Sequence, residues 1–599
     1  MINMSVIYCI CTILLLIGAI LIKKTEKKLD IVKTITITLV LFLCYQTFIS
    51  YVLTILQIPI ILVSLTIING ILVIAMACRI FYKKQIQQYY FEKRDLIFIT
   101  LLIVIVMVIS YLDFGFPFNI KYITTDSSIH YISAREFYEN ESLLLKVENI
   151  ETANAMMPGA YSNIGILFKV FAPLIGEMNL YNVFIGFDIF TLFLIGMLFF
   201  VTIKKYAKNK VTYVLAGIIS IIYLLGYPLN NMLFGYFYLG LGVLCINAIV
   251  AVMQEWEEEQ ALWKKAVSIF LLCFELFFSY YLFAPPVYAS IFIYYIFYFH
   301  KQNGKWFNKS VVVYTLITLV VPTVVGFLYH VLPGMLSTSQ IQVGNVIQLE
   351  GYIYRNLYSN VLLFIPFMIY YLIKQKKMQF DVISIIIFVM YMCVLYISIF
   401  KLNISTYYFF KTYFVLWQFV IYLFFRGICY IAEKKKGQVL ACTYISIYIL
   451  FMTLSFFTSD VQIIKDTFNK NEKITDVMDI YGINKTVLTK VEIDFTKEEL
   501  EILEYVKENP LSLENNNTLI IGNQRQEYWF NALLEYKFKD NLNYATTINY
   551  IENWNKGEYE YLVYFNRSDY YEMYQNDLEI DGNEVVFENS SGGIIRNRR

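Results

Sequence analysis

The chain has 599 residues, of which 58% are hydrophobic, 18% aromatic and only 16% charged. A soluble protein carries about a quarter charged residues, so this composition excludes an ordinary soluble enzyme and indicates a membrane protein. The net charge of +1, with no basic stripe along the chain, favours no nucleic-acid partner.

Apolar runs long enough to cross a bilayer recur along most of the chain. A span needs about 20 apolar residues, and SVIYCICTILLLIGAILI at 5–22 and LIFITLLIVIVMVISYL at 96–112 are examples. We predict an all-α polytopic transmembrane bundle of about fourteen spans by the hydropathy rule. The predicted spans are 4–22, 31–54, 58–81, 96–113, 180–203, 211–229, 233–253, 266–283, 285–300, 311–332, 357–373, 381–400, 408–430 and 438–458.

Short basic loops give the expected orientation of the bundle. Five loops rich in Lys fall on one side of it: 23–28, 82–94, 204–210, 374–377 and 433–436. By the positive-inside rule that side is the cytoplasm. The outward side then carries the longer polar segments: 113–179, 333–356, 401–407 and the tail from 459.

One apolar segment does not fit this scheme as a span. YSNIGILFKVFAPLIG (161–176) is short and contains Ser162, Asn163 and Lys169. Counting it as a span would invert every later basic loop. We therefore expect a helix that lies at the outer surface or dips into the membrane and returns.

The composition changes after residue 458. Residues 459–599 are rich in Asn, Glu, Lys and Tyr and contain no apolar run of span length. The pattern predicts a strand at 518–522, a helix at about 526–537, a strand at 559–565 and a hairpin at 583–597. We thus predict two domains, a transmembrane domain at 1–458 and an extracytoplasmic soluble α/β domain at 459–599.

Polar residues gather in YITTDSSIHYISAREFYENESLL (122–144), directly after an early span. Thr125 or Asp126 suits the N-cap of a helix over about 127–141. Asp126 and His130 are one turn apart and share a face. One interpretation is that Asp126 only caps a solvated helix. The other is that Asp126 is a general base for an acceptor hydroxyl, with His130 sharing the proton, orienting the carboxylate or contacting a phosphate.

The same stretch carries a resemblance to a known superfamily. TTDSSIHYISAREFYENESLL, followed by MMPGAYSNIGILFKVFAPLIG (156–176), resembles the opening of GT-C type membrane glycosyltransferases. These include protein mannosyltransferases, aminoarabinose transferases, arabinosyltransferases and oligosaccharyltransferases. The shared features are an acidic residue in the first large outer loop and a surface helix whose start is rich in Tyr and Pro. Here those positions are Asp126, Pro158 and Tyr161, and the resemblance makes Tyr161 a candidate substrate-binding residue.

The resemblance implies a GT-C-like fold, a polyprenyl-phosphate sugar donor and membrane lipids as surroundings. It also implies an extracytoplasmic acceptor, which can be a glycan, a protein or a lipid. This chain departs from many members in two ways. Asp126 is followed by Ser127 rather than by a second acid, and three spans precede the one before the loop, where a single one is common. The missing acid leaves open any requirement for a divalent metal ion.

A phosphate-bearing donor needs cations near the outer surface. FKLNISTYYFFKTYFVLW (400–417) offers Lys411 together with Tyr407 and Tyr408, and the resemblance implies a donor-binding role for them. The alternative is that Lys411 only extends its ammonium to the head groups. Arg355, in the outer loop, is a second candidate because a guanidinium binds phosphate in a bidentate way. The alternative, which the position of Arg355 favours, is a simple anchor at the loop end.

Two carboxylates fall inside predicted spans, and they support a different class of function. Asp188 and Glu275 each cost about 3 kcal/mol on the insertion scale, so they are expected to face a cavity or a partner. They suit either the active-site cavity or an ion path. An ion path would make the protein a transporter for cell-surface glycan precursors. A polysaccharide polymerase or flippase is a further alternative, because such proteins are also polytopic with polar outer loops.

Other signatures narrow the function and the setting. No glycine-rich phosphate loop occurs, so no nucleotide cofactor is expected. The nine cysteines lie in or beside apolar segments and suit neither a zinc site nor a disulfide framework. The abundance of Ile, Lys and Asn is typical of a bacterial protein, which places the expected location in a bacterial plasma membrane.

Overall fold

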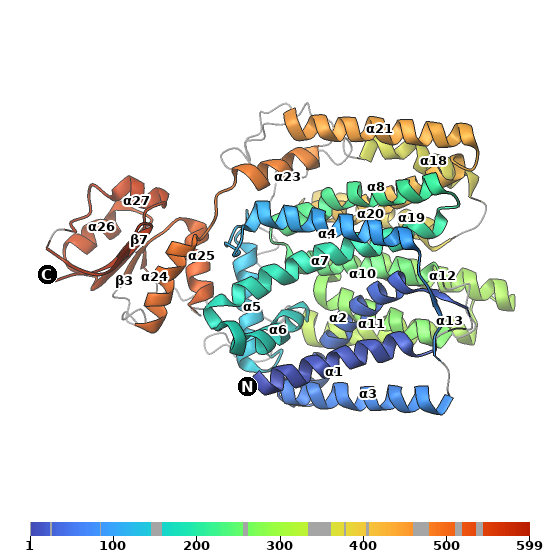
Figure 1. Ribbon diagram of the computed structural model, residues 1–599, viewed down its shortest axis with the longest axis horizontal. Coiled ribbons are helices and arrows are strands. Elements are labelled where there is room, and N and C mark those ends of the chain that lie inside the picture. Colours follow the sequence, from blue (N-terminus) through green and yellow to red (C-terminus); the bar gives the residue numbers. More distant parts are fainter. Residues whose placement is uncertain are drawn as a thin grey trace.

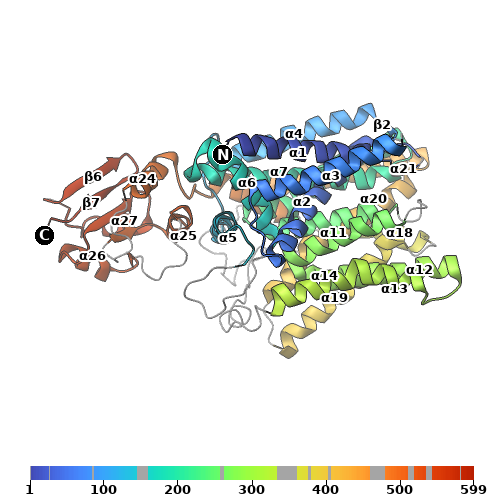
Figure 2. The ribbon, with the colours of Figure 1, turned by 90° about the horizontal axis from the view of Figure 1, so that it is seen from below.

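The structure, a computed structural model, describes residues 2–23, 25, 27–83, 86–144, 159–255, 262–332, 361–375, 379–402, 406–458, 479–509, 518–534, 543–580 and 582–598. Long helices run side by side in a bundle, and a small domain with a sheet lies beyond one end of it (Figures 1 and 2). The C-terminus lies in that small domain.

The bundle contains the helices up to residue 458, together with two short strands. They are α1 (Ile2–Leu21), β1 (Leu29–Asp30), α2 (Ile31–Ile55), α3 (Leu62–Lys83), β2 (Tyr89–Tyr90), α4 (Lys93–Phe114), α5 (Asp126–Asn140), α6 (Ala160–Ile175), α7 (Leu180–Ile203), α8 (Lys210–Leu225), α9 (Tyr227–Leu233), α10 (Phe237–Met253), α11 (Leu262–Tyr280), α12 (Ala284–Asn303), α13 (Lys309–Thr315), α14 (Val321–Gly326), α18 (Ile365–Lys374), α19 (Phe380–Leu402), α20 (Thr406–Ile431) and α21 (Lys435–Thr458).

The predicted polytopic bundle is confirmed. Among the described residues, eleven helical segments are long and apolar enough to cross a membrane. One of them, Leu262–Asn303, consists of α11 and α12, which correspond to two predicted spans. Two shorter apolar helices, Phe237–Met253 and Leu362–Lys374, coincide with two further predicted spans. Hydropathy alone located these helices because each contains a run of apolar residues.

The loops predicted to be cytoplasmic meet at one end of the bundle. There β1 and β2 pair in parallel. The ammonium of Lys204 binds the carboxylates of Asp30 and Asp95 at 2.5 and 2.6 Å. Lys208 pairs with Glu433 at 2.6 Å. Because Lys204 is buried, its two carboxylate partners compensate for the loss of water around its charge.

At the opposite end, α5 and α6 pack against each other beside the small domain (Figures 1 and 2). The close approach depends on Gly165, because a Cβ there would come within 2.2 Å of a ring carbon of Phe137. The first part of α6 is buried from Ala160 to Ile166, and the helix contacts α7 and α2 as well. This packing suits a short helix that covers the end of the bundle.

The small domain is built on a five-stranded mixed sheet in the order β4-β3-β5-β7-β6. Strand β3 is parallel to both neighbours, and β6 and β7 form an antiparallel hairpin. The elements after residue 458 are α23 (Asp479–Lys490), α24 (Lys497–Glu508), β3 (Thr518–Ile521), α25 (Gln524–Leu533), β4 (Asn543–Tyr544), α26 (Ile548–Asn555), β5 (Tyr561–Phe565), α27 (Asp569–Tyr574), β6 (Glu584–Asn589) and β7 (Gly592–Arg596).

The sequence therefore predicted strands β3 and β5 and the hairpin of β6 and β7, but not the two-residue strand β4. The expected α/β class is confirmed. Every residue of β3 is buried, as is typical of a central parallel strand covered on both faces. Helix α24 begins with a capping box, in which Thr496 and Glu499 bind each other's backbone N–H groups. Helix α23 packs against α21, α9 and α4, so this first element of the tail stays with the bundle.

Candidate active site

Asp126 is the first residue of α5 and does not cap it. The N-cap position is occupied by Thr125, and no side chain makes a capping hydrogen bond. The Asp126 side chain is half-buried and makes no hydrogen bond or ion pair to any residue that the structure describes. Its carboxylate lies at the positive end of the α5 dipole, which favours negative charge. The interpretation of Asp126 as a simple helix cap is therefore not supported.

His130 lies one turn further along α5 in an aromatic enclosure. Its Nδ1 atom is 2.8 Å from the hydroxyl oxygen of Tyr161 on α6, and its ring packs edge-on against Tyr238 with centroids 4.6 Å apart. His130 is 3% exposed, and its Nε2 atom has no hydrogen-bond partner among the described residues. Burial, assisted by the charge of Lys411, lowers the pKa of His130 to about 3. The imidazole is therefore neutral at physiological pH.

Lys411 reaches the same place from the first part of α20. Its side chain is 1% exposed, and its ammonium lies 2.9 Å from the ring centroid of Tyr236. A cation over an aromatic face is attracted by the ring's electron density. Tyr236 directly precedes α10, in the turn that receives a 2.6 Å hydrogen bond from the Thr124 hydroxyl to the Phe234 carbonyl. Lys411 is thus linked through Tyr236 to the start of α5.

Electrostatics connects these groups into one cluster. Burial raises the pKa of the Asp126 carboxyl, and the positive charge of Lys411 acts in the opposite direction with a smaller effect. The pKa of His130 responds to the same ammonium. The structure therefore brings Asp126, His130, Tyr161 and Lys411 together at the end of the bundle beside the small domain. We name these four residues the acid–lysine cluster.

The other predicted donor-binding residues are only partly described. Tyr408 lies near Tyr281, in the connection between α11 and α12. Arg355 and the side chain of Tyr407 lie outside the described residues, as does Pro158, the predicted proline at the start of the surface helix. Their predicted roles stay predictions.

The two carboxylates predicted inside spans have other polar neighbours. Asp188 on α7 interacts with Tyr122, in the segment before α5. Glu275 on α11 accepts a hydrogen bond from the Ser279 hydroxyl and interacts with Thr47 of α2. These partners are not members of the acid–lysine cluster, so among the described residues neither carboxylate is seen to join it.

Sequence reasoning missed Tyr236 and Tyr238, which pack against Lys411 and His130. The signal was present as FGYFYLG (234–240), an aromatic turn between two apolar helices. It also missed the small domain's contribution to the segment before α5, described below. Among the described residues, no three His, Cys, Asp or Glu side chains gather into a metal-binding set, so we derive no step through a divalent ion.

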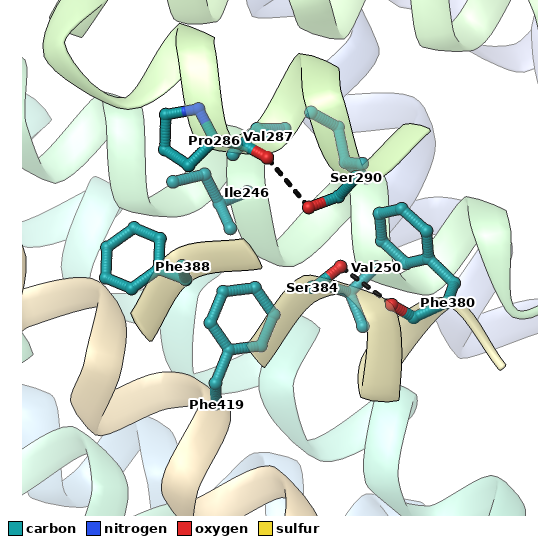
Figure 3. Close-up of a pocket in the computed structure, with 10 residues that line it drawn as sticks. Ile246, Val250, Pro286, Val287, Ser290, Phe380, Ser384, Phe388 and Phe419 are labelled. Carbon is teal, nitrogen blue, oxygen red and sulfur yellow. Dashed lines mark hydrogen bonds between the residues drawn. The ribbon is translucent and has the colours of Figure 1, made fainter. Parts of the chain in front are cut away.

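A pocket elsewhere in the bundle has a different character (Figure 3). It lies between α10, α12, α19 and α20, and its lining is apolar apart from two serines. The hydroxyls of Ser290 and Ser384 donate to carbonyls of their own helices, at 2.7 Å each. Phe419, on the pocket wall, lies two turns along α20 from Lys411. The lining suits hydrocarbon and offers no group for catalysis.

The similarity of this chain to known proteins lies in the three-dimensional structure rather than in the sequence. No protein-family model matches the chain, and no curated protein matches its sequence. It is similar to the crystal structure of ArnT from Cupriavidus metallidurans bound to undecaprenyl phosphate, with a TM-score of 0.45 and 10% identity over 84% of this chain and 97% of that one. The apo ArnT structure gives a TM-score of 0.46 and 10% identity over 84% and 98%.

Proposed function

We propose that this protein is an integral membrane glycosyltransferase of the GT-C type, which transfers a sugar from a polyprenyl-phosphate donor to an extracytoplasmic acceptor. The observation that carries the proposal is the acid–lysine cluster, in which a half-buried carboxylate and a buried ammonium share one site. A carboxylate without a hydrogen-bond partner in the described part of the chain suits proton removal, and a fixed cation suits a phosphate.

Asp126 acts as the general base in this proposal. It takes the proton of an acceptor hydroxyl while that oxygen bonds to the anomeric carbon of the sugar. The bond from the anomeric carbon to the phosphate oxygen breaks, and polyprenyl phosphate leaves with the electron pair. The raised pKa of Asp126 makes its carboxylate a stronger base than an exposed aspartate.

Lys411 balances the charge that develops on the leaving phosphate. A cation fixed before the reaction stabilises such charge without reorganisation, and a surrounding of low polarity strengthens the interaction. Tyr236 holds the ammonium from one side. Arg355, Tyr407 and Tyr408 are assigned to the donor on the resemblance of the sequence alone.

We assign His130 to orienting the reacting groups by hydrogen bonding rather than to accepting or releasing a proton. Its imidazole is neutral, so it has one N–H and one lone pair to offer. If the Tyr161 hydroxyl donates to Nδ1, the Nε2–H is the remaining donor and is available to the Asp126 carboxylate or to a donor phosphate. This arrangement assigns Tyr161 to selecting the tautomer of His130.

The predicted orientation puts this chemistry at the outer leaflet. The acid–lysine cluster lies at the end of the bundle opposite the loops that carry Lys204 and Lys208. With those loops in the cytoplasm, the cluster faces outward, where the head group of a lipid-linked donor is presented.

Polyprenyl phosphate without sugar tests the donor site directly. It should raise the melting temperature of the purified wild-type protein, because a ligand that binds only the folded state stabilises it. Lys411→Met should lose this shift, Asp126→Asn should keep it, and Lys401→Met serves as a matched control, since Lys401 is exposed at the end of α19. A shift of equal size with polyprenol, which lacks the phosphate, would contradict the assignment of Lys411.

A transporter or flippase of glycan precursors is the alternative. It would use Asp188 or Glu275 as charge carriers, since both are buried within the bundle. Glu275→Gln would then abolish movement of lipid-linked sugar across vesicle membranes, and Asp126→Asn would not. The two classes thus make opposite predictions for the same pair of variants.

A further inference from the structure

The small domain binds the segment that leads into α5 through its backbone. Asp494, just before α24, accepts a 3.1 Å hydrogen bond from the Tyr122 N–H. Arg525 on α25 donates to the Tyr122 carbonyl at 3.1 Å. Arg525 and Asp494 also pair with each other, at 3.1 Å. One ion pair from the small domain therefore binds both backbone groups of Tyr122.

The two residues before Tyr122 are also held, Ile120 through its backbone carbonyl and Lys121 through its side chain. The N–H groups of Asp494 and Phe495 donate to the Ile120 carbonyl at 2.7 and 3.3 Å. The Lys121 ammonium donates to the Leu488 carbonyl at 3.0 Å and pairs with Asp113 at 3.2 Å. Three consecutive residues before α5 are thus fixed by α23 and by the chain that follows it.

Trp529 extends the contact onto α5 itself. Its ring stacks on Tyr122 with centroids 6.2 Å apart and packs against Tyr131 at 5.6 Å. Trp529 and Tyr131 are completely buried. Tyr131 is the neighbour of His130 in sequence, so the packing of α25 bears on the helix that carries the proposed chemistry.

The next residues transmit this placement to the acid–lysine cluster. The Ile123 N–H donates to the Leu233 carbonyl at 3.3 Å, and the Thr124 hydroxyl donates to the Phe234 carbonyl at 2.6 Å. These bonds join the start of α5 to the turn that holds Tyr236 beneath Lys411. A displacement of Tyr122 would therefore change the separation of Asp126 from Lys411.

We propose that Arg525 and Asp494 are positioning residues, through which the small domain holds the start of α5, and with it Asp126, in place. A buried ion pair is a poor source of stability compared with apolar packing, whereas its directional hydrogen bonds fix geometry. The kinetic consequence rests on the proposed glycosyltransferase function. The structural consequence, an ordered segment at 122–131, does not.

The test compares two arginine variants in the full-length protein. Arg525→Met removes the contact with Tyr122, and Arg596→Met is the control, because Arg596 pairs with Glu560 at 3.0 Å in the same domain but at the end of strand β7. Arg525→Lys keeps the charge and should restore part of the lost rate. Hydrogen exchange over 122–131 and donor turnover are both measured.

Arg525→Met should raise amide exchange over 122–131 well above that in the control variant. It should lower kcat by about 10–100-fold, since small displacements of reacting groups cost that much, while the donor KM changes by no more than about twofold. Unchanged exchange would overturn the proposal, and so would increased exchange with wild-type kcat. If Asp126→Asn stays active, the proposed function fails, and the exchange data still decide the placement of α5.

Asp494→Asn provides a second variant if Arg525→Met does not fold. The amide keeps an oxygen that accepts from the Tyr122 N–H but removes the charge that pairs with Arg525. It should increase exchange over 122–131 and lower kcat to a smaller extent than Arg525→Met. Wild-type exchange together with wild-type kcat in this variant would overturn the proposal.

Discussion

Lys411 lowers the pKa of the Asp126 carboxyl while burial raises it, and burial is the larger effect. The two residues come from α20 and α5, which are far apart in the chain. The proton affinity of the Asp126 carboxylate, the proposed base, therefore depends on the charge of Lys411. This relationship makes the proposed chemistry testable by pH.

Lys411→Met should shift the pH dependence of transfer. A general base works when deprotonated, so kcat/KM rises as pH increases through the pKa of Asp126. Removing the ammonium removes the influence that lowers this pKa, and the acidic limb should move to higher pH. The measurement is kcat/KM against pH for Lys411→Met beside Lys401→Met. An acidic limb at the wild-type position would show that Lys411 does not act on the base.

His130 should affect stability at acidic pH. Its pKa in the folded protein is about 3, below the value of about 6.5 for an exposed histidine. Between these two values the imidazole is protonated in the unfolded chain and neutral in the folded chain. The contribution of His130 to the free energy of unfolding is therefore lost as pH falls from about 6.5 toward 3. His130→Gln should flatten this part of the plot of melting temperature against pH. An unchanged plot would contradict a neutral, buried imidazole.

Tyr161→Phe isolates the hydrogen bond to His130. The variant keeps the ring that packs beside Phe237 and removes only the hydroxyl. Losing one neutral hydrogen bond costs about 0.5–1.5 kcal/mol, so kcat should fall by roughly 2- to 12-fold if His130 orients the reacting groups. The KM for the donor should stay the same. A loss of donor binding with an unchanged kcat would instead place Tyr161 in the donor site.

Gly235→Ala tests how the start of α5 is held. Gly235 has φ +69°, and a Cβ there would lie 2.7 Å from the Ser127 Cβ. Gly304→Ala is the matched control, because Gly304 has φ +70° and no atom lies within 4 Å of its added Cβ. Both variants carry the same backbone strain, about 1 kcal/mol. Only Gly235→Ala should also reduce turnover, and equal turnover in the two variants would contradict the role of this turn.

Much of the fold could be predicted from the sequence because its signals are local. Apolar length located the spans, and the helix predicted at about 127–141 is observed at Asp126–Asn140. The pairing of Asp126 and His130 on one face follows from their spacing of four residues. The capping preference of aspartate was a misleading local signal, since Asp126 makes no capping bond.

The rest of the site depends on contacts that leave no local pattern. The Lys411 ammonium lies over the ring of Tyr236. This contact depends on the conformation of the turn before α10, which the sequence pattern does not predict. Arg525 binds a backbone carbonyl, and a backbone acceptor has no sequence signature. Arg355 lies outside the described residues, so its expected role in binding the donor phosphate stays a prediction.

Asp126→Asn gives the most direct test of the proposed function. The amide keeps the size of the side chain and cannot act as a base, so transfer from a polyprenyl-phosphate sugar should fall by about 10²–10⁴-fold. Glu139→Gln is the matched control, because Glu139 is an exposed acid on the same helix. The melting temperature and its shift with polyprenyl phosphate should match the wild type. Full transfer activity in a correctly folded Asp126→Asn variant would contradict the account.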